Sequence, residues 1–439
     1  MEIESTRRVF LGTTAPAAVG VGWAGTHALV ANAAPKPGSN DTIVMGLIGC
    51  GGRGRSVMNS FKKLPGVKIA AVCDVHKERL AMGLKAAGNQ AKTYHDYRKL
   101  LEDQSIDAVI VATNGHWHVL PTIDACAAGK DVYVEKPLGT SIGEGRAAVK
   151  AARKYNRIVQ IGTQQHSWEH YKEAVKIVQS GILGEISNVH VWDLENHYPG
   201  FGSPPDGDPP PGFDWDFWVG PSPQVPYNPN RFQYHYWFYD YGGAWQLDWA
   251  VHHYDIVHWA MGVNAPISAV ADGSKFAFFN DNREWPDTFT GACRYPPGPV
   301  AKNGFLMSYA FRDGCTLPIE GCRHAKGFYG TDGALVVNRG GYKIMSEVRG
   351  GKKVIEEKRV GGSKENHAEV FLQCIRSRKR PAADVEVGHY ASNPGHLMNI
   401  AYRVGRKIKW DPKNERVIGD PEADALVTKK YRKPWALPT

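Results

Sequence analysis

The sequence lacks a long hydrophobic segment. Hydrophobic residues make up 42% of its 439 residues, yet no uninterrupted apolar run reaches the ~20 residues that a bilayer-spanning helix needs. We therefore expect no membrane insertion. A chain of this length exceeds one ordinary hydrophobic core, so two domains are expected.

The sequence also lacks a long cluster of like-charged residues. The formal net charge is +9, but the basic residues are scattered among acids, apart from short clusters such as Arg376–Arg380 and Lys429–Lys433. This distribution is typical of a solvated surface, and we expect no nucleic-acid partner.

Cysteine is scarce, and its spacing nowhere resembles a zinc site, so no metal is expected. Cys50, Cys73 and Cys126 lie in apolar segments and are predicted to be core residues. Cys315 and Cys322 could pair in an oxidising compartment, and the sequence leaves this open.

The first residues have the pattern of an export signal. Thr6-Arg7-Arg8-Val9-Phe10-Leu11 is a twin-arginine sequence, a Gly/Ala-rich stretch follows to Val30, and Ala31-Asn32-Ala33 fits a cleavage site. We expect residues 1–34 to be a signal peptide that exports the folded protein. The mature protein is then periplasmic or secreted.

A glycine-rich turn follows the first apolar strand, residues 42–48. Gly49, Gly51 and Gly54 have the G-x-G-x-x-G spacing and open a predicted helix that runs to about Lys63. Such glycines permit a tight turn and let a pyrophosphate approach the free N–H groups of the helix N-terminus. Together with Gly52 and Arg53, which lie between Gly51 and Gly54, these glycines indicate dinucleotide binding.

An acidic residue follows the second predicted strand, Val67–Cys73. Asp74 lies twenty positions after Gly54, where an acid would bind the ribose hydroxyls of a dinucleotide. Because it would repel a 2′-phosphate, it favours NAD over NADP. The nearby Arg53 and Arg79 leave NADP possible.

Strands and helices alternate as far as residue 161, which indicates an α/β fold with a parallel sheet. The predicted strands are Asp107–Ala112, Asp131–Glu135 and Arg157–Ile161, and the predicted helices are Pro121–Ala128 and Ser141–Tyr155. Ligands bind at the carboxyl ends of such strands. The polar residues at those ends are Thr113, Asn114, His118, Glu135, Lys136 and Gln164.

With Glu135-Lys136-Pro137 the sequence resembles the Gfo/Idh/MocA oxidoreductases, the family of glucose–fructose oxidoreductase and inositol dehydrogenase. The likeness also rests on the glycine loop, on residues 128–137 and on residues 242–248 leading into His252, and it extends over nearly the whole mature chain. It implies a Rossmann domain, predicted here at 40–165, and a C-terminal α/β domain at 166–420 with a large open, mostly antiparallel sheet. Residues 421–439 are a predicted tail. The second sheet is often an oligomer interface in the family, so a dimer or tetramer is expected.

The resemblance also implies a lysine, an aspartate and a histidine around the nicotinamide, which are Lys136, Asp248 and His252 here. Two positions depart from the family pattern, Ala244 and Ala250, where the family has glycines. Asp248 and His252 are four positions apart, so on one helix they share a face. The ordinary pKa of histidine suits a base for hydroxyl oxidation, and Lys136 can stabilise the oxygen. Asp248 can grip a neighbouring hydroxyl or orient His252.

An aromatic, proline-rich stretch follows, and it holds seven of the 13 tryptophans between residues 192 and 259. Prolines in 203–212 and 221–229 break it into an irregular arm. Its rings could stack on a sugar or brace a subunit contact, and the sequence leaves both open. His253 is expected to pack or cap rather than to bind a metal with His197 and His252. The further polar candidates for the substrate cleft are His166, Trp168, Glu195, His197, Arg231, Arg323 and His324.

Three functions fit these features. The first is an NAD(P)-dependent oxidoreductase acting on a hydroxyl of a sugar or glycoside. The periplasm holds no free nicotinamide pool, so its cofactor would stay bound and be recycled in place. The second is a redox-neutral glycoside hydrolase that oxidises a ring hydroxyl transiently, eliminates the aglycone, and returns water and hydride. The third, a non-catalytic dinucleotide-binding protein, is disfavoured because Lys136, Asp248 and His252 are all present.

Overall fold

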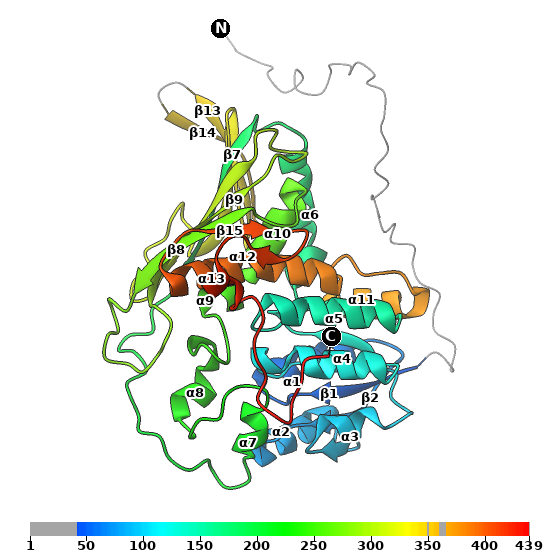
Figure 1. The fold of residues 1–439 in the computed structure, drawn as a ribbon. Coiled ribbons are helices and arrows are strands. Elements are labelled where there is room, and N and C mark those ends of the chain that lie inside the picture. The colour runs from blue at the N-terminus through cyan, green and yellow to red at the C-terminus, as the bar shows by residue number, and fades with distance from the viewer. Residues whose placement is uncertain (1–41, 349–350, 360–365, 439) are drawn as a thin grey trace. The chain divides into compact units, whose positions relative to one another are not determined.

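The computed structural model describes residues 42–348, 351–359 and 366–438. The predicted signal peptide lies outside these ranges. The described chain forms two β-sheets with helices packed against them (Figure 1). Within these ranges, no helix is long and apolar enough to cross a membrane.

The first sheet has six strands in the order β3-β2-β1-β4-β5-β6, and every pair is parallel. Its strands are β1 (Ile43–Ile48), β2 (Val67–Cys73), β3 (Lys92–Tyr94), β4 (Ala108–Val111), β5 (Asp131–Val134) and β6 (Val159–Ile161). The strand order reverses between β1 and β4. Such a switch point leaves a crevice at the carboxyl ends of the strands.

Helices cover this sheet and confirm the predicted α/β alternation. They are α1 (Gly52–Lys62), α2 (Lys77–Ala87), α3 (Tyr97–Leu101), α4 (Val119–Ala127) and α5 (Ile142–Lys154). The strands and helices that the sequence predicts agree with the structure to within two residues at each end. Ser141 caps α5, because its hydroxyl accepts a hydrogen bond from the backbone N–H of Glu144.

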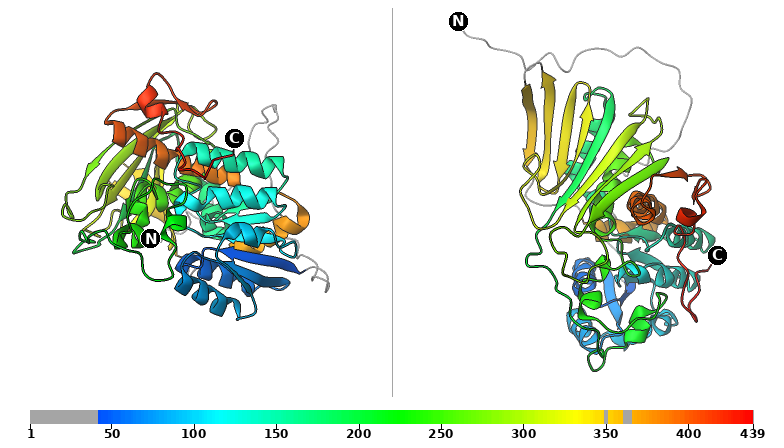
Figure 2. Two further views of the ribbon diagram at one scale, coloured as in Figure 1. Left: turned by 60° about the horizontal axis from the view of Figure 1, so that its bottom comes forward. Right: turned by 60° about the vertical axis from the view of Figure 1, so that its left-hand side comes forward.

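The second sheet has ten strands in the order β14-β13-β12-β11-β7-β10-β9-β8-β15-β16 (Figure 2). Only the central pair, β7 with β10, is parallel among its described pairings, so the expectation of a mostly antiparallel sheet is confirmed. The strands are β7 (Ile186–Leu194), β8 (Ser268–Ser274), β9 (Thr288–Tyr295), β10 (Phe305–Arg312), β11 (His324–Gly330), β12 (Gly333–Asn338), β13 (Gly341–Val348), β14 (Gly351–Arg359), β15 (Ile408–Asp411) and β16 (Arg416–Val417). The oligomeric state and the predicted domain boundaries stay predictions.

Helices α6 (Glu169–Gln179), α10 (Val251–Met261) and α12 (Val385–Val404) pack together against the second sheet. Helix α12 also runs along α5, and α11 (His367–Ser377) packs on α1. The two sheets are therefore joined by helix packing as well as by the chain. This packing holds the end of β5 and the start of α10 in fixed positions relative to each other.

Residues 195–244, which we call the arm, leave β7 and cross to the first sheet (Figure 2). The arm contains the short helices α7 (Trp215–Val219) and α8 (Pro229–Gln233). The Lys77 N–H donates to the Gly212 carbonyl at 2.9 Å, and the Asp214 N–H donates to the Val75 carbonyl at 3.1 Å. The aromatic arm therefore packs beside the loop that follows β2, a role that the sequence does not reveal.

The cysteines are all free thiols. Cys50, Cys73 and Cys126 are buried, as predicted. Cys315 and Cys322 do not form a disulfide.

Candidate active site

The glycine loop connects β1 to α1 and depends on the absence of side chains. Gly49 has a φ of +94°, and a Cβ there would lie 2.6 Å from the Ala112 carbonyl oxygen. A Cβ on Gly54 would lie 2.0 Å from the Gly49 carbonyl oxygen. The glycines thus let α1 start close to β1 and β4, and no side chain caps its first N–H groups.

Asp74 follows β2 and is fixed by two backbone donors. Its carboxylate oxygens accept hydrogen bonds from the Cys50 N–H at 2.7 Å and from the His76 N–H at 2.9 Å. Burial raises the pKa of the Asp74 carboxyl, and these two donors oppose the shift. Asp74 is therefore held at the glycine loop, as a ribose-binding acid requires.

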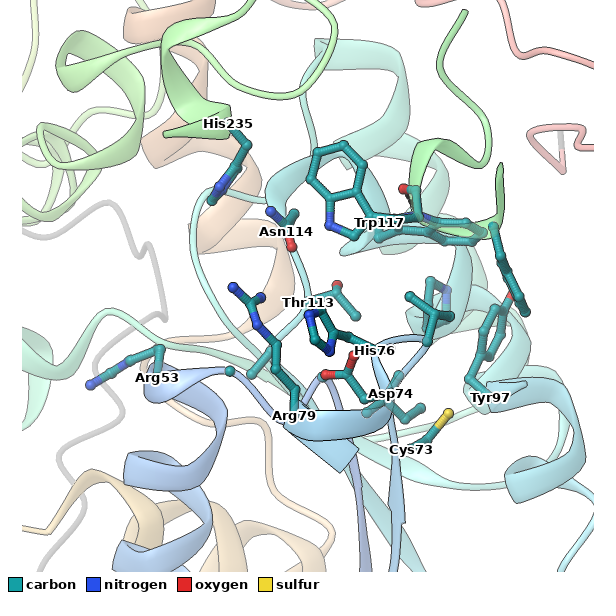
Figure 3. Close-up of a pocket in the computed structure, with 18 of the residues that line it drawn as sticks. Arg53, Cys73, Asp74, His76, Arg79, Tyr97, Thr113, Asn114, Trp117 and His235 are labelled. Carbon is teal, nitrogen blue, oxygen red and sulfur yellow. Dashed lines mark hydrogen bonds between the residues drawn. The ribbon is translucent and has the colours of Figure 1, made fainter. Parts of the chain in front are cut away.

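A cavity of about 250 Å³ lies at the carboxyl ends of β1, β2 and β4. Figure 3 shows Asp74, Arg79 and Thr113 together at its centre, with His235 and Trp117 farther along its wall. Of the residues predicted to bind the cofactor, those that line it are Gly49, Gly51, Gly52, Arg53, Asp74, Thr113 and Asn114.

The other predicted cofactor residues surround this cavity without lining it. Gly54 packs against Gly49, as described above. His118 is buried, and its two ring nitrogens lie 2.7 Å from the Pro137 carbonyl and 3.0 Å from the Thr113 carbonyl. Glu135 forms an ion pair with Arg53 at 2.7 Å, and Gln164 donates to the Tyr133 hydroxyl at 2.9 Å. These residues position the loops, and Lys136 lies with the residues described next.

The arm supplies the far wall of the cavity, which the sequence patterns did not predict. Phe217, Trp218, Phe232, Gln233 and His235 all line it. The His76 ring stacks on Phe232 at 5.7 Å, and the Arg79 guanidinium lies 4.1 Å from the same ring centroid. The aromatic composition of the arm was the available signal, but it did not indicate the partner surface.

Lys136 and Asp248 meet at the end of β5. The Lys136 ammonium donates to the Asp248 backbone carbonyl and lies 3.2 Å from its carboxylate oxygen Oδ2. Asp248 ends the short helix α9 (Trp245–Asp248), whereas His252 belongs to α10. The sequence spacing predicts one helix for the two residues. In the structure they belong to two helices.

Ala244, which replaces a family glycine, precedes α9 in a strained conformation. Its φ of 51° and ψ of −162° lie in a region that favours glycine. Its N–H donates to the Tyr236 carbonyl, and its own carbonyl accepts from the Asp248 N–H, each at 2.7 Å. These bonds hold the strained turn and place Asp248 toward Lys136.

His252 is buried at the start of α10, where the charge of Lys136 acts on it. Burial lowers its pKa well below the ordinary value, and the charges of Lys136 and Arg339 lower it further. Its Nδ1 has no hydrogen-bond partner among the described residues. His252 is therefore neutral at neutral pH and can accept a hydrogen bond from a hydroxyl. It is nevertheless a weaker base than the histidine of ordinary pKa that the sequence predicts, because burial and the neighbouring cations disfavour its protonated form.

We call Lys136, Asp248 and His252 the triad. His235 lies in the wall of the dinucleotide cavity, where charges of the triad act on it. It lines the cavity, and burial lowers its pKa to about 4, while Asp248 opposes the shift and Lys136 adds to it. The charges of Asp248 and Lys136 therefore act on a residue that lines the cavity.

The neighbouring histidine, His253, is part of a buried network. Its Nε2 lies 3.1 Å from Asp193, and its Nδ1 lies 3.3 Å from the ammonium of the buried Lys326. Asp193 also binds Nδ1 of His324 at 3.0 Å, and Nε2 of His324 lies 3.1 Å from Glu195. His253 is thus held by Asp193 and Lys326, where the sequence predicts packing or capping.

The predicted substrate residues outside the triad have different partners. His166 is buried, pairs with Asp255 at 2.9 Å and stacks on Trp259, whereas the partly exposed Arg231 pairs with the exposed Asp206 at 3.1 Å. His197 pairs with Asp313 at 2.9 Å and lies near the Trp245 ring. Trp168 lines a second cavity, of about 370 Å³.

An aromatic chain leads from His252 to the arm. The centroid of the Trp249 ring lies 5.8 Å from that of the His252 ring and 5.4 Å from that of the Trp245 ring. His324 contacts both indoles, at 5.6 Å from Trp249 and 5.9 Å from Trp245. Indole faces beside ionisable groups suit a polyhydroxylated ring, which has both C–H faces and hydroxyls.

Comparison with known proteins agrees with this architecture. The family model "Oxidoreductase family, NAD-binding Rossmann fold" matches residues 43–163, and the model "Oxidoreductase family, C-terminal alpha/beta domain" matches residues 304–437. Together they cover more than half of the chain. The protein belongs to the Gfo/Idh/MocA oxidoreductase family and contains its NAD-binding Rossmann domain.

Similar curated proteins include a glycosyl hydrolase family 109 protein of Saccharopolyspora erythraea, 31% identical over 202 residues, or 41% of this chain and 44% of that protein. An inositol 2-dehydrogenase of Salmonella paratyphi B is 30% identical over 151 residues, or 34% of this chain and 45% of that protein. The chain thus matches less than half the length of each relative. The WlbA dehydrogenase from Bordetella pertussis, in complex with NADH and UDP-GlcNAcA, has a similar fold, with a TM-score of 0.62 and 18% identity over 84% of this chain and 99% of that one.

Proposed function

We propose that this protein is an NAD(P)-dependent oxidoreductase that acts on a hydroxyl of a sugar or glycoside with a tightly bound, internally recycled cofactor. The observation that carries the proposal is the convergence of Lys136, Asp248 and His252 beside the dinucleotide cavity. A lysine ammonium and a neutral histidine are what oxidation of a carbinol needs near the hydroxyl oxygen.

The residues around the first cavity fit NAD. The glycine loop is open where it lines the cavity, because a Cβ on Gly52 would meet no protein atom within 4 Å, and Asp74 accepts a hydrogen bond from the same loop. The buried hydroxyl of Thr113 has no hydrogen-bond partner among the described residues, so it is free to bind a ligand. When bound, NAD⁺ accepts a hydride from the carbinol carbon. Asp74 favours NAD over NADP, because a carboxylate repels a 2′-phosphate.

The chain itself would manage the proton. The substrate hydroxyl donates a hydrogen bond to the neutral imidazole of His252, which takes the proton as the carbon–oxygen double bond forms. Lys136 donates a hydrogen bond to the same oxygen and stabilises its developing negative charge. Asp248 holds the ammonium in place through the 3.2 Å contact. In the reverse direction His252 returns the proton.

Retention of the cofactor is supported by the way the arm is tied down. Ring nitrogens of His116 and Trp117 bind the Trp218 carbonyl at 2.9 and 2.8 Å. From the C-terminal segment, Arg432 donates to the Gly220 carbonyl at 3.0 Å, and Trp435 packs on Trp117 and Phe217. A dinucleotide in the cavity would be enclosed by these elements. Export by the predicted twin-arginine signal, which is also a proposal, would make such retention necessary.

The test is the identity and retention of the cofactor. The mature protein is purified without added dinucleotide, denatured, and the released compounds are identified by mass spectrometry. We expect near-stoichiometric NAD(H) or NADP(H), and reduction of the bound cofactor when a sugar is added. The double variant R432A/W435A removes contacts that hold the arm. We expect this variant to lose most of its cofactor on dialysis. An empty wild-type site that binds NAD only weakly would contradict internal recycling.

A second candidate function, redox-neutral cleavage of a glycoside, is favoured by His324. Burial lowers the pKa of His324, but hydrogen bonds to Asp193 and Glu195 outweigh burial and raise this pKa to about 9. His324 is therefore a charged acid at neutral pH, and its ring lies 5.6 Å from that of Trp249. The likeness to a protein named glycosyl hydrolase family 109 also supports this candidate. Release of a chromogenic aglycone without added cofactor would distinguish it from net oxidation.

A further inference from the structure

The one-turn helix η3 (His235–Trp237) of the arm holds His235 in the wall of the dinucleotide cavity. Figure 3 shows the His235 side chain pointing into the cavity above Asn114, with Asp74 toward the opposite end. No hydrogen bond or ion pair joins either ring nitrogen of His235 to a residue that the structure describes, and neither nitrogen is covered by protein atoms. Both nitrogens are therefore accessible to a ligand.

The other two histidines that line the cavity differ from His235. Nε2 of His95 lies 2.9 Å from a carboxylate oxygen of Asp214. The His76 ring stacks on two phenylalanines of the arm, at centroid distances of 4.8 and 5.7 Å, and its Nδ1 is buried. Of these three histidines, only His235 has both ring nitrogens accessible and without a partner among the described residues.

The charge state of His235 limits what it can bind. Burial lowers its pKa to about 4, so the imidazole is neutral at neutral pH. A neutral imidazole donates a hydrogen bond from one nitrogen and accepts one at the other. It therefore suits a hydroxyl, which can donate or accept, better than a phosphate, which carries negative charge and only accepts.

The position of His235 selects one half of the dinucleotide. Asp74 follows β2 and marks the adenosine ribose, so the dinucleotide crosses the glycine loop toward the ends of β4 and β5. Asn114 follows β4 and lies near His235 in Figure 3, and Lys136 follows β5 and acts on His235 through its charge. His235 thus faces the nicotinamide half, whose hydroxyls are those of the second ribose.

The segment that carries His235 is fixed by the same turn that places Asp248. The Tyr236 carbonyl accepts a hydrogen bond from the Ala244 N–H, and the Ala244 carbonyl accepts one from the Asp248 N–H, each at 2.7 Å. A Cβ on Gly242 would lie 2.4 Å from the Tyr236 Cα, so the two segments are in close contact. A residue that is held in place before a ligand arrives loses little freedom on binding.

We infer that His235 binds a hydroxyl of the nicotinamide ribose, so that the arm anchors the nicotinamide half of the cofactor. This contact adds a residue from outside the Rossmann domain to the cofactor site. The inference rests on the proposed function for its cofactor, because it assigns a further residue to the same dinucleotide cavity.

The test compares ADP, ADP-ribose and NAD⁺, which share adenosine and pyrophosphate, whereas only the last two contain the second ribose. Their dissociation constants are measured by titration calorimetry on the mature protein freed of its cofactor. We expect His235→Ala to weaken ADP-ribose and NAD⁺ about tenfold, the loss of one buried hydrogen bond, and to leave ADP within about twofold of the wild type. His235→Gln, which keeps a donor and an acceptor, should recover part of the loss.

His190→Ala is the matched control, since His190 is a half-buried histidine on β7 that does not line the cavity. It should bind the three ligands as the wild type does. Asp74→Asn, at the adenosine end, should weaken all three by about the same factor, and thermal unfolding of each variant checks the fold. The inference is overturned if His235→Ala weakens ADP as much as NAD⁺, because His235 would then only support the arm, or if it weakens none of the three.

The binding series contains no sugar, so the two proposals fail separately. If the second ribose binds through His235 but no sugar reduces the bound cofactor, the ribose contact stands and the proposed function falls. If a sugar reduces the cofactor while His235→Ala binds all three ligands as the wild type does, the oxidoreductase proposal stands and this inference falls.

Discussion

The dinucleotide side and the substrate side of the site are built from different chemistry. Around the first cavity the decisive features are backbone ones, since Gly49 and Gly54 face main-chain oxygens at distances that admit no Cβ. Around Lys136 the decisive features are charges carried by long side chains from separate elements. The first side should therefore fail through steric change and the second through a change of charge. The predictions below test this difference.

The largest effect is expected on the substrate side. Lys136→Met and His252→Ala should each lower kcat by about 10²–10⁴, the contribution typical of a positioned acid or base. Cofactor content should stay near that of the wild type, because neither side chain lines the dinucleotide cavity. Lys150→Met, at an exposed lysine of α5, is the control. Full turnover in both triad variants would refute the assigned roles.

On the dinucleotide side, Gly54→Ala should destabilise the protein by roughly 1–3 kcal/mol, the usual cost of overpacking. The new Cβ would lie 2.0 Å from the Gly49 carbonyl oxygen. Gly52→Ala is the informative partner, because a Cβ there meets no protein atom within 4 Å. It should leave the melting temperature unchanged or higher while weakening the cofactor. Equal melting temperatures for both variants would show that the loop is not held by contact with β1.

The histidines of the Asp193 network should give the stability two pH limits. Burial lowers the pKa of His253 to about 4, so its contribution is lost as the pH falls from 6.5 toward 4. The folded-state pKa of His324 is raised to about 9, so its contribution is complete below 6.5 and is lost as the pH rises through 9. Each limb should change the free energy of unfolding by about 1 kcal/mol per pH unit. Urea titrations should show that His253→Gln makes the acid limb less steep, while His235, His258 and His367, whose pKa values burial also lowers to about 4, keep part of its slope. His324→Gln should make only the alkaline limb less steep.

The smallest effect is expected for Asp74→Asn. The amide oxygen can still accept one backbone hydrogen bond, so the fold should persist while the repulsion of a 2′-phosphate disappears. We expect the preference for NAD over NADP to fall by about tenfold, the equivalent of roughly 1.4 kcal/mol. The ratio of the two dissociation constants, measured on protein stripped of cofactor, checks this. An unchanged ratio would mean that Arg79 and not Asp74 decides the preference.

The first sheet was predictable because its elements follow one another in the chain and repeat a simple pattern. The ends of parallel strands meet at one edge, so Gly49, Asp74 and Thr113 could be placed together from strand ends alone. Strand β3 (Lys92–Tyr94) was missed because it is polar and mostly exposed, whereas the equally short β6 is fully buried and largely apolar. Helices α2 and α3 were also not predicted.

The rest of the site depends on contacts that no local pattern encodes. His235 and Phe232 reach the cavity because the arm pairs with the loop after β2, and an irregular segment carries no periodicity that shows its path. Similarly, the spacing of Asp248 and His252 predicts one helix, whereas the turn at Trp249 and Ala250 divides them.

The parallel pairing of β7 with β10 has a consequence for the order of folding. Val189 lies opposite Met307 in the sheet, so more than a hundred residues must be made before the two strands can meet. The first sheet, by contrast, closes within residues 43–161. Because loop closure over long separations slows folding, we expect the first sheet to form early and the second to follow. The arm lies between β7 and β10, so it can settle over the cavity only late, after a dinucleotide has had time to enter.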